Sequence, residues 1–394
     1  MVVILIAAST KLTADTGTCG GATTTVPFTD VMSSPFFCQI AEAFFSGLTN
    51  GTTATTYSPN DLLPREQMAA FTTRTMDQSL KRGSRRASLD QYWTPTSADG
   101  VGFTPVGVNP RLLKSDGTDV WVASGLPNGN GAVSRVRCSD GKLLETWTGA
   151  DFAFGVLVAK GRIFVTGNDN PGKLYQIDPT QTAGAVATLT TALGDFTRGI
   201  AFDGARVWTA NEGMPFTNTG SVSIVTLNPV SVNNIATGFG ALWGMVYDGA
   251  NIWVTDNGDQ TIKKLDASGN ILQAVPVGNE PRFPAFDGTN IWVPNVLADT
   301  VTVVRASTGA VLATLSGNGM NGPFAAAFDG ERVLITNNGG GGPTAPGPVS
   351  LWHAASLAPL GFVSLGTSNL PRGVCSDGLN FWIALQGTNQ LARF

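Results

Sequence analysis

A chain of 394 residues is long enough for two domains, and its net charge of −4 provides no large basic surface, so nucleic acid is not an expected partner. Only 13% of the residues are charged and 48 are glycine, which argues against long helices and favours a mainly β fold of short strands and turns. The single histidine, His353, excludes a His-based metal site within one chain, and we interpret it as a structural or surface residue.

An apolar and Gly/Thr-rich arm is predicted for residues 1–27. Its first eight residues, MVVILIAA, resemble part of a signal peptide but lack the basic residues that usually precede one. This stretch is too short to cross a membrane and no other segment has a transmembrane pattern, so we do not expect a transmembrane chain. If the apolar terminus is retained, it needs a partner surface, for example on a neighbouring subunit.

A small helical module is predicted for residues 28–80. Ser34 is placed to cap a first helix with Pro35 at its first position, and Gly47 suits the end of that helix. A second helix is expected to begin at Pro64. Residues 81–90 then form a basic linker.

The order of motifs in this module resembles the S-layer-homology family. The matching segments are FTDV at 28–31, IA at 40–41, GLTNG at 47–51, YSP at 57–59 and LPREQMA at 63–69. The resemblance implies binding to cell-wall polysaccharide, with Asp30 and Arg65 at the matching positions for wall binding or assembly. Only one copy is visible, so avidity is lacking unless subunits assemble. Wall attachment and self-assembly into a homo-oligomer or filament through residues 1–76 remain open alternatives.

The four cysteines form no C-x-x-C pair, which argues against structural zinc. Their even number in an apparently exported protein suggests disulfides. Cys19 and Cys38 bracket the start of the module, and we predict a bridge that fastens the arm to the first helix. A second bridge between Cys138 and Cys375 is possible, because both lie near turns of repeats that would be neighbours.

A repeat begins at about residue 90. Turns spaced 39 to 48 residues apart mark seven units, at Asp116-Gly117, Lys160-Gly161, Asp203-Gly204, Asp248-Gly249, Asp287-Gly288, Asp329-Gly330 and Asp377-Gly378. In five units a tryptophan follows five residues after the aspartate, and we expect its ring to pack between repeats. Four strands per unit predict a seven-bladed β-propeller over residues 91–394. The last unit has chain for three strands only, so we expect residues 91–96 to supply its outer strand and close the ring.

This pattern resembles the YVTN/NHL-like propellers, including streptogramin-lyase-like proteins. The resemblance covers residues 90–394 and specifies the fold far better than the function. The lyase chemistry of these relatives uses a histidine base, and the lone His353 lies in a differently organised sixth unit, so the activity is not carried over.

A ring of side chains is predicted at the mouth of the central channel. Five residues before the turn aspartate stand Arg111, Arg198, Arg282 and Arg372, and Trp243 and Phe324 take the same position in two further units, with Phe154 close to it in the remaining one. Arginines interleaved with aromatic rings suit an acidic or sugar-like ligand. The alternative is architectural: each arginine pairs with an acidic neighbour, as Glu280 could with Arg282, or bonds loop carbonyls.

Calcium is the one cofactor that the sequence leaves open. The loops after the second strands carry Asn211, Asp256, Asn295 and Asn337, whose oxygens suit Ca²⁺, although Asn and Asp are also common in turns. Lactonase-like propellers hold a channel metal with such residues, but here only Asp256 is an acid.

Three functions therefore compete. The first is a non-enzymatic extracellular protein of the bacterial surface, in which the propeller is a scaffold or interaction module. The second is a lyase or lactone hydrolase that works at the channel mouth. The third is a lectin-like protein that binds a glycan or anion there.

Overall fold

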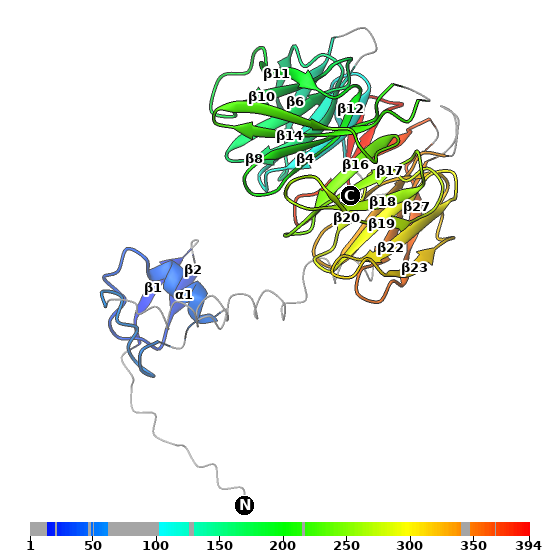
Figure 1. Ribbon diagram of the computed structural model, residues 1–394. Coiled ribbons are helices and arrows are strands. Elements are labelled where there is room, and N and C mark those ends of the chain that lie inside the picture. The colour runs from blue at the N-terminus through cyan, green and yellow to red at the C-terminus, as the bar shows by residue number, and fades with distance from the viewer. Residues whose placement is uncertain are drawn as a thin grey trace, which may run out of the picture. The chain divides into compact units, whose positions relative to one another are not determined.

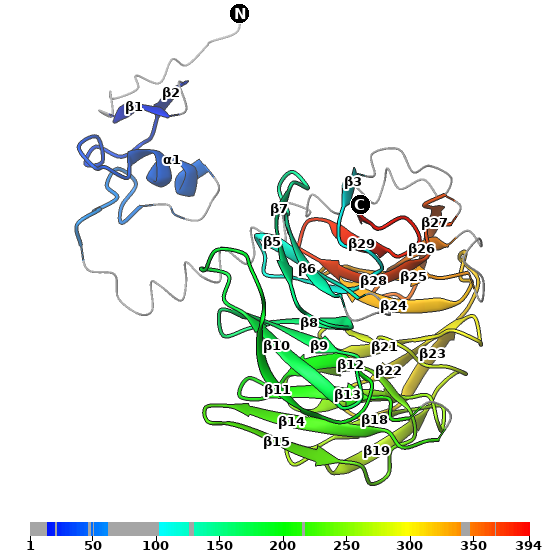
Figure 2. The ribbon, with the colours of Figure 1, turned by 90° about the horizontal axis from the view of Figure 1, so that it is seen from above.

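A computed structural model of the chain describes residues 14–19, 22–45, 49, 51–61, 102–125, 130–214, 217–339, 347–366 and 368–394. The chain divides into two compact units, Met1–Tyr92 and Trp93–Phe394, and each is described by itself. The second unit is the predicted propeller, with seven four-stranded antiparallel sheets (Figures 1 and 2).

The first strand of each blade is the innermost, because these strands contact one another from blade to blade around the channel. The three later strands follow outwards in chain order, except that β3 is the outermost strand of blade 7. Blade 1 contains β4 (Pro110–Ser115), β5 (Asp119–Ser124), β6 (Ala132–Arg137) and β7 (Leu143–Thr148); blade 2 contains β8 (Ala153–Ala159), β9 (Arg162–Gly167), β10 (Gly172–Ile177) and β11 (Ala187–Leu193). Blade 3 contains β12 (Thr197–Phe202), β13 (Val207–Asn211), β14 (Ser221–Leu227) and β15 (Val230–Ile235); blade 4 contains β16 (Leu242–Tyr247), β17 (Ile252–Asp256), β18 (Thr261–Leu265) and β19 (Ile271–Pro276); blade 5 contains β20 (Ala285–Phe286), β21 (Asn290–Asn295), β22 (Thr300–Arg305) and β23 (Val311–Leu315). Blade 6 contains β24 (Pro323–Phe328), β25 (Arg332–Asn337), β26 (Pro348–His353) and β27 (Pro359–Ser364); blade 7 contains β28 (Pro371–Ser376), β29 (Phe381–Leu385), β30 (Gln390–Arg393) and β3 (Gly102–Pro105).

The ring closes through β3, which pairs antiparallel with β30 so that blade 7 contains both ends of the propeller. The sequence prediction placed this closing strand at residues 91–96, and that position is wrong; residues 91–96 lie outside the described part of the chain. Only residues 106–109 separate β3 from the inner strand of blade 1. A similarly short connection, residues 149–152, joins blade 1 to blade 2, so the step between blades fixes where the closing strand lies.

Each Asp-Gly turn is tied to the tryptophan that follows it. In blade 4 the Asp248 carboxylate accepts hydrogen bonds from the backbone N–H of Ala250 and Asn251, and from the indole Nε1 of Trp253 at 2.7 Å. The same indole bond joins Asp116 to Trp121, Asp203 to Trp208, Asp287 to Trp292 and Asp377 to Trp382. In blade 6 leucine replaces tryptophan, and Asp329 receives the Arg332 side chain instead.

These side chains fill the spaces between blades, as the sequence predicts. Trp121 packs with Val156, Ile163 and Val165 of blade 2, and Trp382 packs with Val120 and Val122 of blade 1. Both indoles are completely buried. The propeller core therefore consists of separate apolar layers between neighbouring blades. The hydrogen-bonded turn sets the position of each tryptophan ring in its layer.

The N-terminal unit contains a hairpin of β1 (Thr16–Cys19) and β2 (Ala22–Thr25), followed by α1 (Phe37–Phe45). A disulfide between Cys19 and Cys38, with the Cα atoms 5.5 Å apart, joins the hairpin to the helix and confirms the predicted pair. Ser34 Oγ accepts a hydrogen bond from Phe36 N, so the helix is capped as expected but begins two residues later than Pro35. The second predicted helix, the linker and Arg65 lie outside the described residues. Within the described part of the chain, no helix is long and apolar enough to cross a membrane.

The turn carboxylate is expected to be essential to blade packing. Asp248→Ala leaves the buried Trp253 indole N–H and two turn N–H groups without their acceptor, and we expect it to lower the free energy of unfolding by about 2–3 kcal/mol. Asp266→Ala removes an exposed turn carboxylate between β18 and β19 that bonds no buried indole, and should cost much less. Urea unfolding followed by tryptophan fluorescence measures both, and equal losses would contradict the role of the indole bond.

Candidate functional site

Seven side chains, one from each blade, meet at one end of the channel, and we call them the mouth cluster. Each is the second residue of its inner strand or, in blade 5, lies between the Pro281–Asn295 bridge and β20. Its members are Arg111, Phe154, Arg198, Trp243, Arg282, Phe324 and Arg372. The structure thus brings together every residue that the sequence pattern placed at the mouth.

A break in strand pairing aims these side chains inwards. In six blades the register between the first and second strands shifts at the position of the cluster residue, which is the pattern of a β-bulge. In blades 2, 4 and 6 a threonine of the second strand then links the bulge to the next blade. Thr255 Oγ1, for example, accepts from Gly244 N and donates to the carbonyl of Arg282 at 2.7 Å.

Trp243 lies between two arginines. The guanidinium carbons of Arg198 and Arg282 lie 3.8 Å and 3.4 Å from the centroid of its ring, and they come from the blades on either side. Two guanidinium groups at these distances do not fit on one face, so each covers a different face of the indole. This stacking is the geometry of a cation–π interaction, and it holds three of the seven members of the mouth cluster together.

Four aromatic rings contact one another among the arginines of the mouth cluster. The ring of Phe283 lies 5.9 Å from Phe154, 6.0 Å from Trp243 and 5.3 Å from Phe324, measured between centroids. We call these four rings the aromatic plug. The sequence analysis missed Phe283, although four other blades carry glycine at its position, which makes a phenylalanine there an exception to the repeat.

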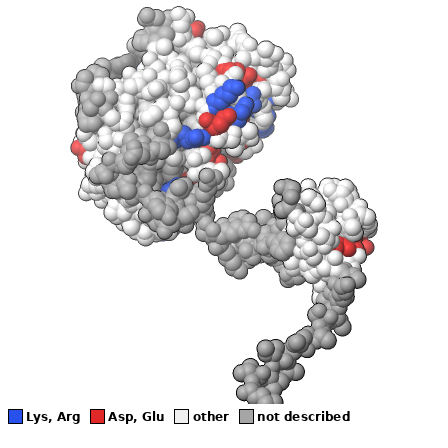
Figure 3. All heavy atoms as spheres, turned by 180° about the vertical axis from the view of Figure 1, so that it is seen from behind, with Lys and Arg blue, Asp and Glu red and all other residues white. Residues whose placement is uncertain are grey.

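The charges of the mouth cluster do not balance. Glu212 pairs with Arg198, and Glu280 pairs with Arg282 at 2.7 Å, as the architectural alternative anticipated for that residue. Arg372 donates only to the neutral Gln386 side chain, and no described carboxylate pairs with Arg111. Two of the four positive charges therefore have no counter-charge among the described residues. Elsewhere, basic and acidic side chains lie next to one another on the propeller face in Figure 3.

Burial makes this excess charge costly. It lowers the pKa of Arg111 and Arg372 to about 10, with a further contribution from repulsion by neighbouring arginines. Burial also lowers the pKa of Arg282 to about 10, against the opposing effect of Glu280. These values lie well above 7, so the side chains stay charged at neutral pH and repel one another.

Unused hydrogen-bond donors point to what is missing from the cluster. Arg282 is 8% exposed, and its Nε and Nη1 have no hydrogen-bond partner within the described structure. The buried Nε1 of Trp243 has none either. A buried donor without an acceptor costs about 1–3 kcal/mol. The site is therefore short of acceptors and of negative charge together.

The four candidate calcium ligands lie in separate blades and have other partners. Asp256 is fully buried, accepts from Gly240 N, Ala241 N and Gly258 N, and pairs with Lys263 at 2.5 Å. Asn211, Asn295 and Asn337 bond hydroxyl groups of their own third strands. No group of three or more His, Cys, Asp or Glu side chains suited to a metal occurs among the described residues.

The other candidate site residues from the sequence, Asp30, His353, Cys138 and Cys375, lie in a loop, at a strand end or in the core. Both oxygens of Asp30 accept from the backbone N–H of Tyr57 or Ser58, which ties two loops of the N-terminal unit together. His353 ends β26 and bonds Ser356 in the turn that follows. Cys138 and Cys375 pack in one core cluster as free, buried thiols, so the possible second disulfide is not formed. Burial raises the pKa of the Cys138 thiol to about 12, which makes it a poor nucleophile at neutral pH.

Comparisons with known proteins agree on the fold and go no further. No family model and no curated protein matches the chain. Among solved structures, the chain is similar to virginiamycin B lyase from Staphylococcus aureus, at 16% identity and a TM-score of 0.59 over 74% of this chain and 98% of that one. It is also similar to U3-55K, at 10% identity and 0.61 over 76% and 99%, and to the WD40 propeller of Doa1, at 14% and 0.56 over 75% and 97%. Identities this low establish a shared seven-bladed architecture only.

The buried position of Asp256 predicts a structural role in place of a metal-binding one. Asp256→Ala leaves Lys263 buried and three backbone N–H groups without an acceptor, and we expect a loss of about 3–5 kcal/mol of stability. Asp259→Ala removes the half-exposed second partner of Lys263 and should cost less than about 1 kcal/mol. Thermal unfolding with and without Ca²⁺ measures both; a stabilisation by Ca²⁺ that Asp256→Ala abolishes would favour the metal site.

Proposed function

We propose that this chain is a non-enzymatic protein of the bacterial cell surface, whose propeller binds an acidic ligand at the mouth cluster. Its N-terminal unit would attach the propeller to wall polysaccharide or to further copies of the chain. The observation that carries the ligand proposal is the coincidence, in one cluster, of unpaired guanidinium charge and buried donors that lack an acceptor.

An acidic ligand would supply both of the things that the cluster lacks. A carboxylate or phosphate accepts two parallel hydrogen bonds from one guanidinium group, and a delocalised anion relieves the repulsion between neighbouring arginines. Arg111 and Arg372 come from adjacent blades 1 and 7 and are both partly exposed, so they are the residues that we assign to the ligand. The rings of Phe154 and Phe324, which lie next to Arg111 and Arg372, offer apolar contacts for the ring of an acidic sugar.

The same residues argue for binding over catalysis. General acid–base catalysis at neutral pH works best with a group whose pKa lies near 7. The cluster contains arginines with pKa values near 10, and the two carboxylates beside it, Glu212 and Glu280, are held in ion pairs with arginines of the cluster. Asp256, which the enzyme alternative requires, is buried against Lys263 in place of lining the channel. We therefore place a lyase or lactonase activity second.

The ligand proposal is tested with D-glucuronate as a probe and D-glucose as its uncharged counterpart. Glucuronate is expected to raise the Tm of the intact protein and to bind measurably in calorimetry, whereas glucose does neither. Arg111→Gln and Arg372→Gln should each weaken glucuronate binding by roughly tenfold or more, because each removes a charged donor. Binding should be constant from about pH 6 to 9 and fall above about pH 10, where the cluster begins to lose protons.

Arg162→Gln is the matched control, since this arginine begins β9 and pairs with Asp178 at an exposed site away from the channel mouth. It should leave glucuronate binding unchanged. Equal binding of the acid and the neutral sugar, or equal effects of all three arginine variants, would show that the mouth cluster is not an anion site.

Surface attachment is tested separately, on the full chain. The wild type is expected to co-sediment with purified Gram-positive cell walls, or to exceed the mass of one chain in light scattering, and Arg65→Ala should reduce the corresponding signal several-fold. Arg86→Ala, in the predicted linker, is the control that should leave it unchanged. A protein that neither sediments with walls nor assembles would contradict both forms of the attachment proposal.

A further inference from the structure

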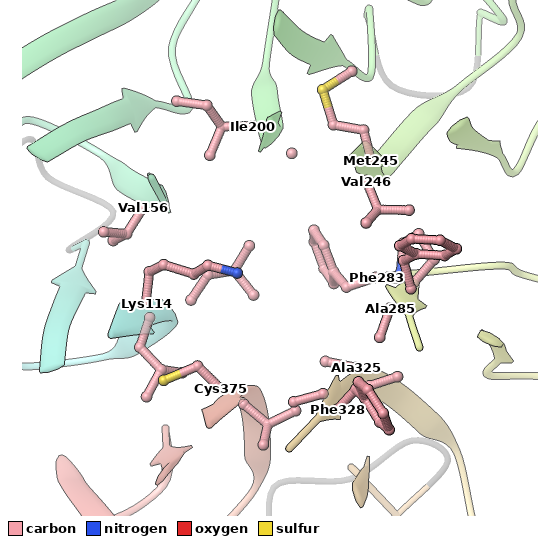
Figure 4. A pocket seen from close by; sticks show the side chains of 18 of the residues that line it. Lys114, Val156, Ile200, Met245, Val246, Phe283, Ala285, Ala325, Phe328 and Cys375 are labelled. Atoms are coloured by element: carbon pink, nitrogen blue, oxygen red, sulfur yellow. The ribbon is translucent and has the colours of Figure 1, made fainter. Parts of the chain in front are cut away.

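A cavity of about 360 Å³ lies along the inner strands, with Phe283 among its lining residues (Figure 4). Most of the side chains that line it are apolar, such as Ile200, Met245, Val246 and Val374, whereas polar atoms contribute the larger part of its exposed lining. Cavities of this volume accommodate small organic ligands.

Lys114 is the one charged side chain among the described residues that line this cavity. Figure 4 shows its chain reaching into the cavity from β4, with the amine towards the open space. No carboxylate and no hydrogen-bond acceptor pairs with the amine in the described structure. The neighbouring hydroxyl groups make other hydrogen bonds: the Tyr247 hydroxyl donates to the Gly249 carbonyl at 2.7 Å, and Ser376 Oγ accepts from Gly378 N.

The repeat makes this lysine an exception. In each blade one inner-strand residue pairs in register with the tryptophan position of the second strand, and in blade 1 it is Lys114, opposite Trp121. The equivalent residues are Leu157, Ala201, Val246, Ala285, Ala327 and Cys375. A residue that builds the propeller would recur from blade to blade, whereas a ligand contact is needed only once. Blade packing therefore gives no reason for a lysine at this position.

We propose that this cavity binds a small monoanion with an apolar body, with Lys114 as the counter-charge to its acidic group. The apolar walls would cover the body of the ligand, and the amine would donate charge-assisted hydrogen bonds to the acid. The cavity shares only Phe283 with the aromatic plug, and none of the four mouth-cluster arginines lines it. The proposal goes beyond the proposed function and stands or fails without it.

The test uses 2-naphthoate and its neutral counterpart 2-naphthamide, titrated calorimetrically into the intact protein. The acid is expected to bind at least about tenfold more tightly than the amide. Lys114→Met keeps the length of the side chain and supplies the apolar character found in the other blades, so it should fold normally. It should weaken naphthoate binding by about tenfold or more and leave naphthamide binding unchanged.

Two controls locate the site. Lys160→Met changes an exposed turn lysine between β8 and β9, outside the cavity, and should alter neither affinity. Arg111→Gln removes charge from the mouth cluster and should leave the Lys114-dependent part of naphthoate binding unchanged. If Arg111→Gln weakens naphthoate binding and Lys114→Met does not, the anion sits at the mouth and the proposal is wrong. It is equally wrong if the wild type binds neither probe or does not distinguish acid from amide, because Lys114 is then only a solvated surface amine.

Discussion

In five of the seven blades, a hydrogen bond from a buried indole to a turn aspartate orients the ring that packs against the next blade. One carboxylate accepts the turn N–H groups and the indole N–H together, so the hairpin closes and the ring is oriented in a single arrangement. The oriented ring then packs on the second strand of the neighbouring blade, as Trp121 does against Val165. Because the ring of blades is closed, each such contact constrains all the others. The position of every inner strand, and of the side chains at its two ends, depends on it.

The two ends of the inner strands are used differently as a result. At one end a bulge interrupts the pairing and directs one side chain per blade into the channel, where nothing in blade packing dictates its identity. Arginine and aromatic residues alternate there with a surplus of positive charge. Along the rest of the strands most side chains that line the channel cavity are apolar, and Lys114 is the one charged side chain among the described residues there. The side chains that we propose for ligand binding thus occupy positions that the fold holds in place, although blade packing does not require these residues there.

The sequence contained most of this architecture because the turn recurs in seven units and the tryptophan lies close to it in the chain in five of them. The mouth cluster was predictable for the same reason, because its residues stand at or near a fixed number of positions before each turn. The closing strand was misplaced because the residues at 91–96 and those of β3 both look like strands, and only the short step between blades decides for Gly102–Pro105. That step was readable from the repeats, in residues 149–152 for example.

Other features depend on contacts between distant parts of the chain and had weaker signals. The pairing of Arg198 with Glu212 spans two strands, and only the equivalent spacing of Arg372 and Gln386 hints at it. Cys138 and Cys375 do lie in one core cluster, as adjacent blades require, but packing in a cluster does not bring two sulfur atoms into bonding geometry. The inner strands are also closely packed. A Cβ atom on Gly199 would lie only 2.5 Å from the Trp243 carbonyl oxygen, so there is no room for a side chain between these neighbouring strands. Under the two binding proposals, selectivity would rest on the few side chains that break the repeat, such as Lys114.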